Sequence, residues 1–354
     1  MSDTVLVTGG AGFIGCHLAR RLLQRGNHVL AFDNLHPQVH TKRGRPVDLE
    51  PDVELLPGDV TLAGNWETLL KLHRPRFVVH LAAETGTGQS LTEATRHASV
   101  NGVGTSQMLD AFTRAGHVPE HIVLTSSRAI YGDGAWRDGR GRTFYPDGRS
   151  RSQLEQRQWD FSSPEGEPSQ SLPSAAGKTF PNPVNIYAAT KLAQEHMLSA
   201  WARARGAHLT VLRLQNVYGP GQAPGNPYTG VLTLFARLAQ QKQVLDVYED
   251  GHIIRDFVYV EDVAAAIVGA LQKPTEAVRT FDIGSGVPTT ILEVAREIAR
   301  RSGAPEPHVT GKFRDGDVRA ASCEIDRAQL VLGYSPLYDL QRGLGELVDA
   351  FRAE

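Results

Sequence analysis

A tyrosine and a lysine four positions apart give the clearest chemical signal in the sequence. Tyr187 and Lys191 lie in the segment NIYAATKLAQEHMLSAWARARG, whose apolar spacing predicts a helix. Side chains four residues apart share one face of a helix, and a cation within about 4–6 Å of a phenol favours its phenolate form. A phenolate near neutral pH can act as a general base toward a sugar or alcohol hydroxyl. Because such a pair also arises by chance, it needs supporting residues.

A serine at the end of a predicted strand is one supporting residue. The apolar run His121 to Thr125 predicts a buried strand, and the segment SSRAIYG follows it. The Ser127 hydroxyl could form a hydrogen bond with the reacting oxygen, whereas Ser126 is expected to cap the strand end. Ser127 therefore joins Tyr187 and Lys191 as a candidate for catalysis at a carbon that carries a hydroxyl group.

The segment VLVTGGAGFIGCHLARRLLQRG near the N-terminus predicts a phosphate-binding turn. Thr4 to Thr8 has the pattern of a buried strand, and apolar residues recur at helical spacing from Phe13 to Leu23. Glycines between a strand and a helix let a phosphate approach the backbone, where the helix N-terminus offers free N–H groups. A tight turn with a packing glycine is the alternative. The glycines at this junction are Gly9, Gly10, Gly12 and Gly15.

An acidic residue after the second predicted strand indicates which dinucleotide would bind. Asn27 to Phe32 predicts a short strand that ends at Asp33, about 20 residues beyond the glycines. A carboxylate at that position can accept a hydrogen bond from a ribose 2′-hydroxyl, which favours NAD over NADP. Asp59 and Val60 follow a third predicted strand on the same side of the sheet, so we expect them near the adenine.

Strand and helix patterns alternate along the chain, which predicts an α/β fold with a Rossmann-type, doubly wound parallel sheet. We expect an NAD-binding Rossmann domain over residues 1–218 and a smaller, partly interleaved C-terminal substrate domain over 219–354. Segment 257–284 is expected to return to the Rossmann sheet, and Ala94 to Ala115 to form one long helix. Residues 132–185 are rich in Gly, Pro, Ser and Arg without periodicity, which is typical of a functional excursion.

The composition indicates an ordinary globular protein that binds a small molecule. The chain has 354 residues and a formal net charge of −2, which provides no attraction for nucleic acid or an anionic membrane. Two cysteines, Cys16 and Cys323, cannot form a disulfide framework and suit a reducing cytoplasm. No apolar run approaches the ~20 residues that span a bilayer, and the histidines lack metal-ligand spacing. We therefore expect a cytoplasmic protein with no metal, membrane or nucleic-acid partner.

These segments together resemble the extended short-chain dehydrogenase/reductase family, and within it the nucleotide-sugar epimerases. TGGAGFIG is that family's form of the glycine motif, and the resemblance runs to DGDVRAASCEIDRAQLVLGYSP, nearly the whole chain. It implies that Ser127, Tyr187 and Lys191 form the catalytic set and that the protein pairs into a homodimer through its helices at 94–115 and 186–204. It implies NAD contacts at Gly9, Gly12, Phe13, Ile14, Gly15, Asp33, Asn34, Asp59, Val60, Leu81, Ala82, Ala83, Asn101, Tyr187, Lys191 and Gln215.

The second half of the chain resembles the part of the family that binds a nucleotide-diphosphate sugar. RLQNVYGPG places Asn216 at a diphosphate position, while IIRDFVYVEDV and KFRDGD place Arg255 and Arg314 at two others. Guanidinium groups can pair bidentately with phosphate oxygens. Ala321, seven residues after Arg314, falls on the position that sets the room beside C2 of the sugar. The implied substrate contacts are Thr85, Gly86, Thr87, Ser127, Asn216, Val231, Arg255, Arg314 and Ala321.

The residues after Ser127 separate the reactions that this scaffold carries. Family dehydratases have an Asp-Glu pair there and decarboxylases a glutamate, but this chain has Arg128 and Ala129. Epimerase/reductases that act at C3 and C5 use a Cys–His pair, and neither cysteine is suitably placed. What remains is hydride chemistry at one carbon with Tyr187 as the base, and the resemblance implies epimerisation at C4 through a 4-keto sugar. The segments GTGQS (86–90) and GPGQAPGNPYTGV (219–231) resemble bacterial epimerases of the dTDP-L-rhamnose 4-epimerase type more than the UDP-glucose 4-epimerase type.

Three other functions stay open at this point. An NAD(P)-dependent 4-ketoreductase would use the same residues, although Asp33 favours retained NAD over consumed NADPH. Inversion could also occur at a single carbon other than C4. A catalytically silent NAD-binding sensor would have the same fold, but loss of Ser127, Tyr187 or Lys191 would be expected in it. The sequence names neither the base nor the sugar of the substrate.

Overall fold

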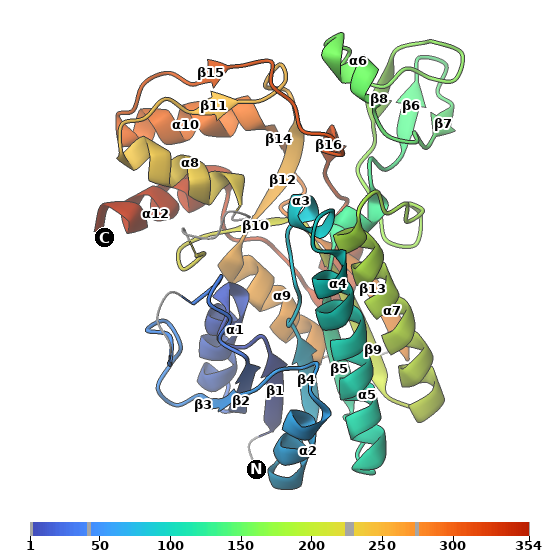
Figure 1. Cartoon of the computed structure of the whole chain (residues 1–354), viewed down its shortest axis with the longest axis vertical. Helices are drawn as coiled ribbons and strands as arrows, with labels where there is room; N and C mark the ends of the chain where they lie inside the picture. The colour runs from blue at the N-terminus through green and yellow to red at the C-terminus, as the bar shows by residue number, and fades with distance from the viewer. Residues whose placement is uncertain (1–2, 41–43, 224–229, 273–275, 354) are drawn as a thin grey trace.

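Seven parallel strands form the central sheet of the protein, in the order β13-β9-β5-β4-β1-β2-β3 (Figure 1). The structure is a computed structural model that describes residues 3–40, 44–223, 230–272 and 276–353. The strand order reverses at β1, so the predicted doubly wound α/β fold is confirmed. The strands are β1 (Thr4–Thr8), β2 (His28–Asp33), β3 (Glu54–Pro57), β4 (Phe77–His80), β5 (His121–Ser127), β9 (His208–Leu214) and β13 (Val278–Ile283).

Helices cover both faces of this sheet, which explains why its strands are almost uniformly apolar. On one face, α1 (Phe13–Gln24) and α9 (Val260–Gln272) pack with α11 (Asp326–Leu332) around a buried cluster that includes Leu18 and Ile267. On the other face, α2 (Ala63–Leu72), α5 (Gly104–Arg114) and α7 (Ile186–Arg205) bury a cluster that includes Trp66 and Phe112. The two layers hold the strand ends, where the site residues lie, in a fixed arrangement.

The long helix expected from Ala94 to Ala115 is continuous but contains a π-helical turn. It consists of α4 (Ala94–His97), the π segment η1 (Ala98–Val103) and α5. Single π turns inside α-helices often occur at functional sites, because the extra residue redirects a side chain. Here the turn contains Asn101, whose Nδ2 donates to the Glu84 carbonyl (3.1 Å) and the Thr190 hydroxyl (2.9 Å). The turn therefore ties this helix to the end of β4 and to α7.

A smaller second unit lies above the carboxyl ends of the main strands in Figure 1. Its sheet contains β10 (Asn216–Tyr218), β12 (Ile254–Tyr259), β14 (Pro288–Thr290) and β16 (Ala320–Ala321). Helices α8 (Val231–Gln240), α10 (Ile291–Ser302) and α12 (Leu340–Ala353) pack into its core, and a two-stranded sheet joins β11 (Asp246–Val247) to β15 (His308–Val309). A Thr290–Glu293 capping box starts α10, as the local sequence favours.

Segment 257–284 is divided between the two sheets. Its first residues continue β12, which pairs with β10 and β14 in the smaller sheet. The chain then crosses over, so that α9 packs against the main sheet and β13 pairs with β9 at its edge. The return to the main sheet thus begins at α9, because the residues of β12 satisfy their backbone hydrogen bonds within the other sheet.

The excursion between residues 132 and 185 forms a small lobe of its own (Figure 1). It contains a three-stranded antiparallel sheet, β7-β6-β8, and the short helix α6 (Arg151–Glu155). Trp136 packs edge-on against Phe161 with ring centroids 5.0 Å apart, which provides a small apolar core. The strands are β6 (Trp136–Asp138), β7 (Thr143–Phe144) and β8 (Ser169–Ser171).

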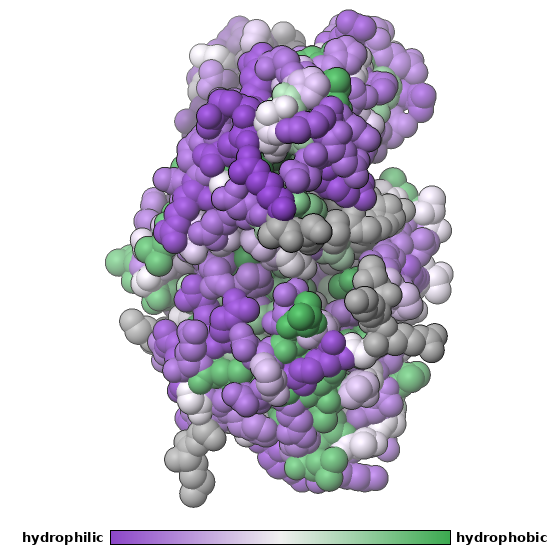
Figure 2. Space-filling model, turned by 90° about the vertical axis from the view of Figure 1, so that its left-hand side faces the viewer, coloured by the Kyte–Doolittle hydropathy of each residue, from purple (hydrophilic) through white to green (hydrophobic). Residues whose placement is uncertain are grey.

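The face drawn in Figure 2 is largely hydrophilic in its upper part, and its apolar residues gather in separate patches lower down. None of the helices that the structure describes combines the length and apolar character that a membrane crossing requires.

Candidate active site

A cavity of about 480 Å³ opens at the carboxyl ends of the main strands. Its wall combines the glycine turn after β1 with the ends of β2, β4 and β5, the first turns of α7 and the segment after β9. This is the edge where open α/β sheets bind ligands. The predicted residues that line it are Gly9, Gly12, Phe13, Ile14, Gly15, Asp33, Asn34, Val60, Leu81, Ala82, Ala83, Thr85, Gly86, Ser127, Tyr187, Lys191, Gln215 and Asn216.

Several predicted residues lie behind this wall or away from it. Asp59 accepts a hydrogen bond from Nδ2 of Asn34 (3.2 Å), so it supports a lining residue. Asn101 is fully buried, and Val231 starts α8 next to Gly230, which lines the cavity. Part of the expected contact segment 219–231 lies outside the described residues. The predicted residues that are absent from the wall are Asp59, Thr87, Asn101, Val231, Arg255, Arg314 and Ala321.

The wall also contains polar residues that sequence reasoning missed. His36, His40 and Arg96 belong to the loop after β2 and to α4, and Gln222 follows β10. His36, His40 and Arg96 fall in no motif, whereas Gln222 lies in the segment GPGQAPGNPYTGV quoted above; only the tertiary structure brings these segments to the same cavity. Among the described residues, no group of histidine, cysteine and carboxylate side chains is arranged to hold a metal ion.

The glycine turn leaves room only for backbone along this wall. Gly9 has φ +66°, and a Cβ there would lie 2.8 Å from the Ala82 nitrogen. A Cβ on Gly15 would lie 2.5 Å from the Gly10 carbonyl oxygen, so the helix packs directly on the turn. No side chain caps the N-terminus of α1, so its first N–H groups are available to a phosphate. The turn thus has the form that a dinucleotide pyrophosphate requires.

Two polar side chains fit the ends of a dinucleotide. Asp33 accepts hydrogen bonds from the N–H groups of Ala11 (3.1 Å) and Leu35 (2.8 Å), which holds its carboxylate beside the glycine turn. Gln215 is 4% exposed, and neither Oε1 nor Nε2 of its amide has a hydrogen-bond partner among the described residues. A buried amide without partners is costly, and a bound carboxamide such as that of nicotinamide would satisfy it. The residues present therefore fit NAD.

Ser127, Tyr187 and Lys191 meet on the wall of the same cavity. Asn185 caps α7 by accepting a hydrogen bond from the Ala188 N–H (2.9 Å), which places Tyr187 in the first turn. Burial raises the pKa of the Tyr187 phenol, while a hydrogen bond with the Ser127 side chain and the charge of Arg128 lower it. The predicted grouping of the three side chains is present in the structure.

The electrostatics of the pair differ from the sequence-based expectation that Lys191 converts Tyr187 to a phenolate. Burial lowers the pKa of Lys191 to about 7, although the charge of Glu195 raises it. Nζ of Lys191 donates to Oε1 of Gln194 (2.6 Å). Desolvation is thus the largest influence on both groups, and it favours a neutral phenol and a neutral amine. Arg128 supplies the positive charge that lowers the pKa of Tyr187 against this desolvation.

A buried polar network fixes the strand end that carries Ser127. The expectation that Ser126 caps the strand is wrong, because its hydroxyl donates to Oε1 of Glu195 on α7 (2.5 Å). Glu195 pairs with Arg213 on β9 (2.7 Å), and Nη1 of Arg213 donates to the Tyr131 hydroxyl (2.8 Å). The Tyr131 hydroxyl in turn donates to Asp282 on β13 (2.9 Å). The network holds β5 against α7, so that Ser127 stays beside Tyr187.

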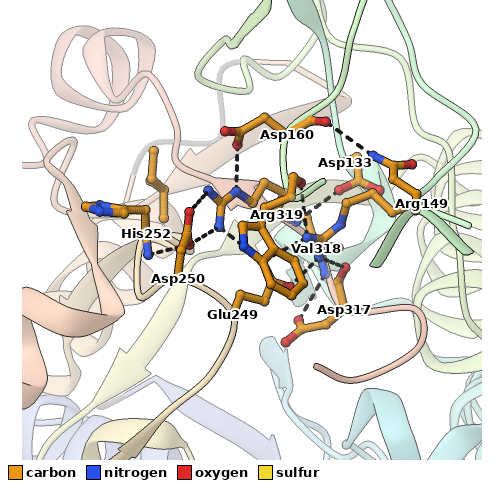
Figure 3. Close-up of polar contacts among 12 residues, drawn as sticks. Asp133, Arg149, Asp160, Glu249, Asp250, His252, Asp317, Val318 and Arg319 are labelled. Atoms are coloured by element: carbon orange, nitrogen blue, oxygen red, sulfur yellow. Dashed lines mark hydrogen bonds and ion pairs between the residues drawn. The ribbon is translucent and has the colours of Figure 1, made fainter. Parts of the chain in front are cut away.

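Ion pairs attach the 132–185 excursion to the C-terminal unit (Figure 3). Arg149 pairs with Glu249 (2.8 Å), and both side chains are 1% exposed. The Arg319 guanidinium lies among Asp160, Asp250 and Glu249 at 2.7, 2.7 and 3.0 Å. These ion pairs position the excursion against the C-terminal unit, although Nε of Arg149 and Oε1 of Glu249 have no hydrogen-bond partner among the described residues.

Two arginines lie closer to the catalytic residues. Arg255 pairs with Asp317 (2.8 Å). Arg128 donates from Nη2 to the Gly132 carbonyl (3.1 Å) and forms no ion pair with any described residue. Desolvation and the like charge of Arg255 lower the pKa of Arg128 to about 10, although Asp133 and Asp317 oppose this. The Arg128 guanidinium, which acts on Tyr187 and has the charge of Arg255 near it, favours an anionic substrate.

The remaining two predicted substrate residues have different surroundings. Ala321 is buried opposite Arg255 in the β12–β16 register and lines a small hollow that also contains Arg128. Arg314 is exposed and stacks over the Tyr248 ring, 5.1 Å from its centroid. The structure therefore brings Ala321 and Arg255 together near the catalytic end and leaves Arg314 outside the cavity wall.

Fold and site define a dinucleotide-binding α/β enzyme with a Ser–Tyr–Lys set. The sequence model of the NAD dependent epimerase/dehydratase family matches residues 5–152 and 160–284, and the chain belongs to this family.

Named relatives extend over nearly the whole chain. The dTDP-L-rhamnose 4-epimerase of Burkholderia thailandensis is 54% identical over 344 residues, which cover 97% of this chain and 93% of that protein. The UDP-glucose 4-epimerase of Thermotoga maritima, solved with UDP-glucose, superposes with a TM-score of 0.78 at 29% identity and 99% coverage of both chains. The Thermus thermophilus UDP-glucose 4-epimerase, solved with NAD, has a TM-score of 0.77, 30% identity and the same coverage.

Proposed function

We propose that this protein is an NAD-dependent 4-epimerase of a nucleotide-diphosphate sugar, with a dTDP-linked 6-deoxyhexose such as dTDP-L-rhamnose as the first candidate substrate. One observation carries the proposal: Ser127, Tyr187 and Lys191 line a cavity that also contains the glycine turn, Asp33 and the unpartnered Gln215 amide. The 54% identity to a dTDP-L-rhamnose 4-epimerase supports the choice of substrate.

Tyr187 is the proposed acid and base. Its phenolate takes the proton of the sugar C4 hydroxyl as C4 is oxidised to a ketone, and Ser127 forms a hydrogen bond with the same oxygen. NAD supplies the chemistry that accepts and returns the two electrons at C4. The 4-keto sugar rotates in the pocket and presents its other face. Tyr187 returns the proton to the C4 oxygen, and reduction of C4 on that face completes the inversion. The hydrogen bond with Ser127 and the charge of Arg128 keep the phenolate form accessible in a buried site.

The substrate diphosphate is assigned to Asn216 and the neighbouring arginines. Asn216 lines the cavity next to Gln215, and the charge of Arg128 lacks an ion-pair partner among the described residues. Arg255 would exchange its contact with Asp317 for phosphate oxygens, which are better bidentate acceptors. Ala321 would border the sugar ring near C2. In this assignment NAD is held mainly by residues 1–218, and the nucleotide sugar by the unit formed from residues 219–354.

We also propose that the protein is a cytoplasmic homodimer. The helices α4–α5 and α7 lie side by side on one face of the main sheet (Figure 1), where a second copy could extend them into a four-helix bundle. Val103 is 48% exposed on this helix pair, although it is apolar. Both cysteines are free, which suits a reducing compartment.

The experiment is a substrate screen with an identified cofactor. The purified protein is denatured to identify the released nucleotide, and dTDP-, UDP-, GDP- and CDP-sugars are screened by NMR for inversion at C4. Bound NAD and inversion of a dTDP-sugar without net cofactor consumption support the proposal. Continuing, stoichiometric consumption of NADPH would establish a 4-ketoreductase instead. Bound NAD without turnover of any sugar would favour a sensor, and inversion at another carbon would correct the position.

A further inference from the structure

A buried chain of hydrogen bonds runs from the catalytic lysine to the glycine turn. Lys191 Nζ donates to Gln194 Oε1 (2.6 Å), and Gln194 Nε2 donates to the Thr105 hydroxyl (2.8 Å). Nε2 of His80 lies 3.0 Å from the same hydroxyl, and its Nδ1 lies 2.7 Å from the hydroxyl of Thr8. All five side chains are at most 3% exposed. The chain therefore connects α7 with the last residue of β1, directly before Gly9.

In one consistent assignment of protons, Nε2 of His80 and Nε2 of Gln194, which lie 3.2 Å apart, both donate to the Thr105 hydroxyl. The Thr8 hydroxyl accepts from the Ala82 N–H (3.2 Å), so it can donate its own proton to Nδ1 of His80. The Thr105 hydroxyl donates to the Asn101 carbonyl (2.7 Å), so it accepts from Nε2 of His80 and from the amide of Gln194. Desolvation lowers the pKa of His80 to about 3, which keeps the ring neutral with its proton on Nε2.

The same assignment fixes the direction of the Gln194 amide. Its nitrogen faces the Thr105 hydroxyl, whose own proton is already directed at a carbonyl, so its oxygen faces Lys191. A reversed amide would bring two donors, Nε2 and Nζ, within 2.6 Å of each other. The neutral network thus presents a hydrogen-bond acceptor to the buried ammonium group.

We propose that Gln194 is a positioning residue for Lys191, which holds the ammonium group in the cavity wall and keeps it charged without adding a negative charge beside it. A buried ammonium needs an acceptor. A carboxylate at this position would also stabilise it, but would cancel its field at Tyr187. A carboxamide oxygen stabilises the cation and leaves the net positive charge of the wall unchanged. The consequence for turnover rests on the proposed function, whereas the consequence for NAD binding does not.

Few other charges act on the two catalytic groups. Glu195 on the same helix raises the pKa of Lys191, and His80 on β4 is its neutral neighbour. Tyr187 is faced by Ser127 on β5, Arg128 after it, and the His97 ring on α4, 6.5 Å between centroids. Burial already lowers the pKa of Lys191 to about 7, so the loss of one acceptor should change its charge near neutral pH.

Two nearly isosteric variants test the role in opposite directions. The full-length protein, as purified and after exchange with NADH, is titrated from about pH 6 to 9 for dinucleotide binding, and kcat and KM are measured over the same range. In Gln194→Met, which lacks the acceptor, we expect dinucleotide affinity to fall about tenfold near neutral pH and the alkaline limb of the binding profile to shift to lower pH, because the charge of Lys191 is lost at a lower pH. In Gln194→Glu, we expect the alkaline limb of the binding profile to shift to higher pH. We also expect the acid limb of the kcat profile to shift to higher pH, because Tyr187 loses the field of Lys191.

The controls separate positioning from packing. Gln329→Met, at an exposed position on α11, should change neither limb. Thr105→Val should show a weaker form of the Gln194→Met effect and Thr105→Ser should restore the parent behaviour, which keeps the test decisive if a Gln194 variant does not fold.

A residue that only fills the core would lower the melting temperature and change neither pH profile. Folded Gln194 variants with unshifted binding and kcat profiles and unchanged dinucleotide affinity would therefore overturn the inference. The proposed function fails separately. Shifted dinucleotide binding without inversion of any sugar would preserve the role of Gln194 and refute the epimerase, whereas inversion with unshifted profiles would do the reverse.

Discussion

Two sides of the cavity are stabilised by different kinds of interaction: the cofactor wall, formed by the glycine turn and the strand ends of the main sheet, and the substrate wall, formed where the 132–185 excursion meets the C-terminal unit. Behind the cofactor wall, Lys191 is the only charged member of a hydrogen-bonded chain that continues through Gln194, Thr105, His80 and Thr8. Behind the substrate wall, arginines and carboxylates form ion pairs between the 132–185 excursion and the C-terminal unit (Figure 3). The first wall is made of regular strands and helices, and the second is made largely of loops.

This difference follows from what each wall must do. Neutral hydrogen bonds fix the geometry of the Lys191 side chain without adding a further charge beside it. Loops lack a regular backbone ladder, and buried Arg–carboxylate pairs are directional enough to hold them in one arrangement. Such pairs are sensitive to the loss of either partner. Four variants, taken from the largest expected effect to the smallest, test the contrast.

Tyr187, where the two walls meet, should give the largest loss of activity. Tyr187→Phe keeps the ring and removes the base, so kcat should fall by ~10²–10⁴-fold while NAD remains bound. Activity is measured by C4 inversion and NAD by release on denaturation. Near-normal turnover in this variant would eliminate Tyr187 as the base.

The stability of the substrate wall should depend strongly on each of its buried ion-pair partners. Glu249→Gln leaves Arg149 and Arg319 without their shared carboxylate, which is buried, so the free energy of unfolding should fall by about 3–5 kcal/mol. Denaturant titration provides the measurement. Glu324→Gln breaks the exposed pair with Lys178 and should cost under about 1 kcal/mol. Equal costs for the two variants would contradict the contrast between buried and exposed pairs.

The size of the residue at position 321 should determine which sugars fit the substrate wall. Ala321→Tyr adds a ring opposite Arg255, and overpacking of this kind commonly costs ~1–3 kcal/mol, roughly 5- to 150-fold in kcat/KM. We expect this loss for substrates with a bulky C2 substituent and little loss for those with a plain hydroxyl. An equal loss for both kinds of substrate would show that Ala321 does not border C2.

Arg128 should influence the pH dependence from the substrate side. Its charge lowers the pKa of Tyr187, so Arg128→Gln should raise that pKa and shift the acid limb of kcat to higher pH, because the phenolate is lost below the pKa. Arg203→Gln, at an exposed position on the same helix as Tyr187, should leave the limb in place. An unshifted limb in Arg128→Gln would mean that Lys191 and the cofactor alone determine the Tyr187 pKa.

The cofactor half was predictable because its signals are local. Strand, glycine turn, helix and the acidic residue at the end of β2 lie within about 30 residues of one another, so one βαβ pattern places Gly9, Gly15 and Asp33 together. The spacing of Tyr187 and Lys191 likewise determines that they share a helix face.

The tertiary structure alone decided the partners of the catalytic groups. Spacing could not show that Gln194 contacts Thr105, that Ser126 contacts Glu195 instead of capping its strand, or that Arg314 lies outside the cavity wall. Those contacts depend on which helix packs on which strand, and on how far burial opposes charge at each position. Sequence determined the residues that could do the chemistry, whereas packing determined their pKa values, because desolvation depends on neighbours that come from distant parts of the chain.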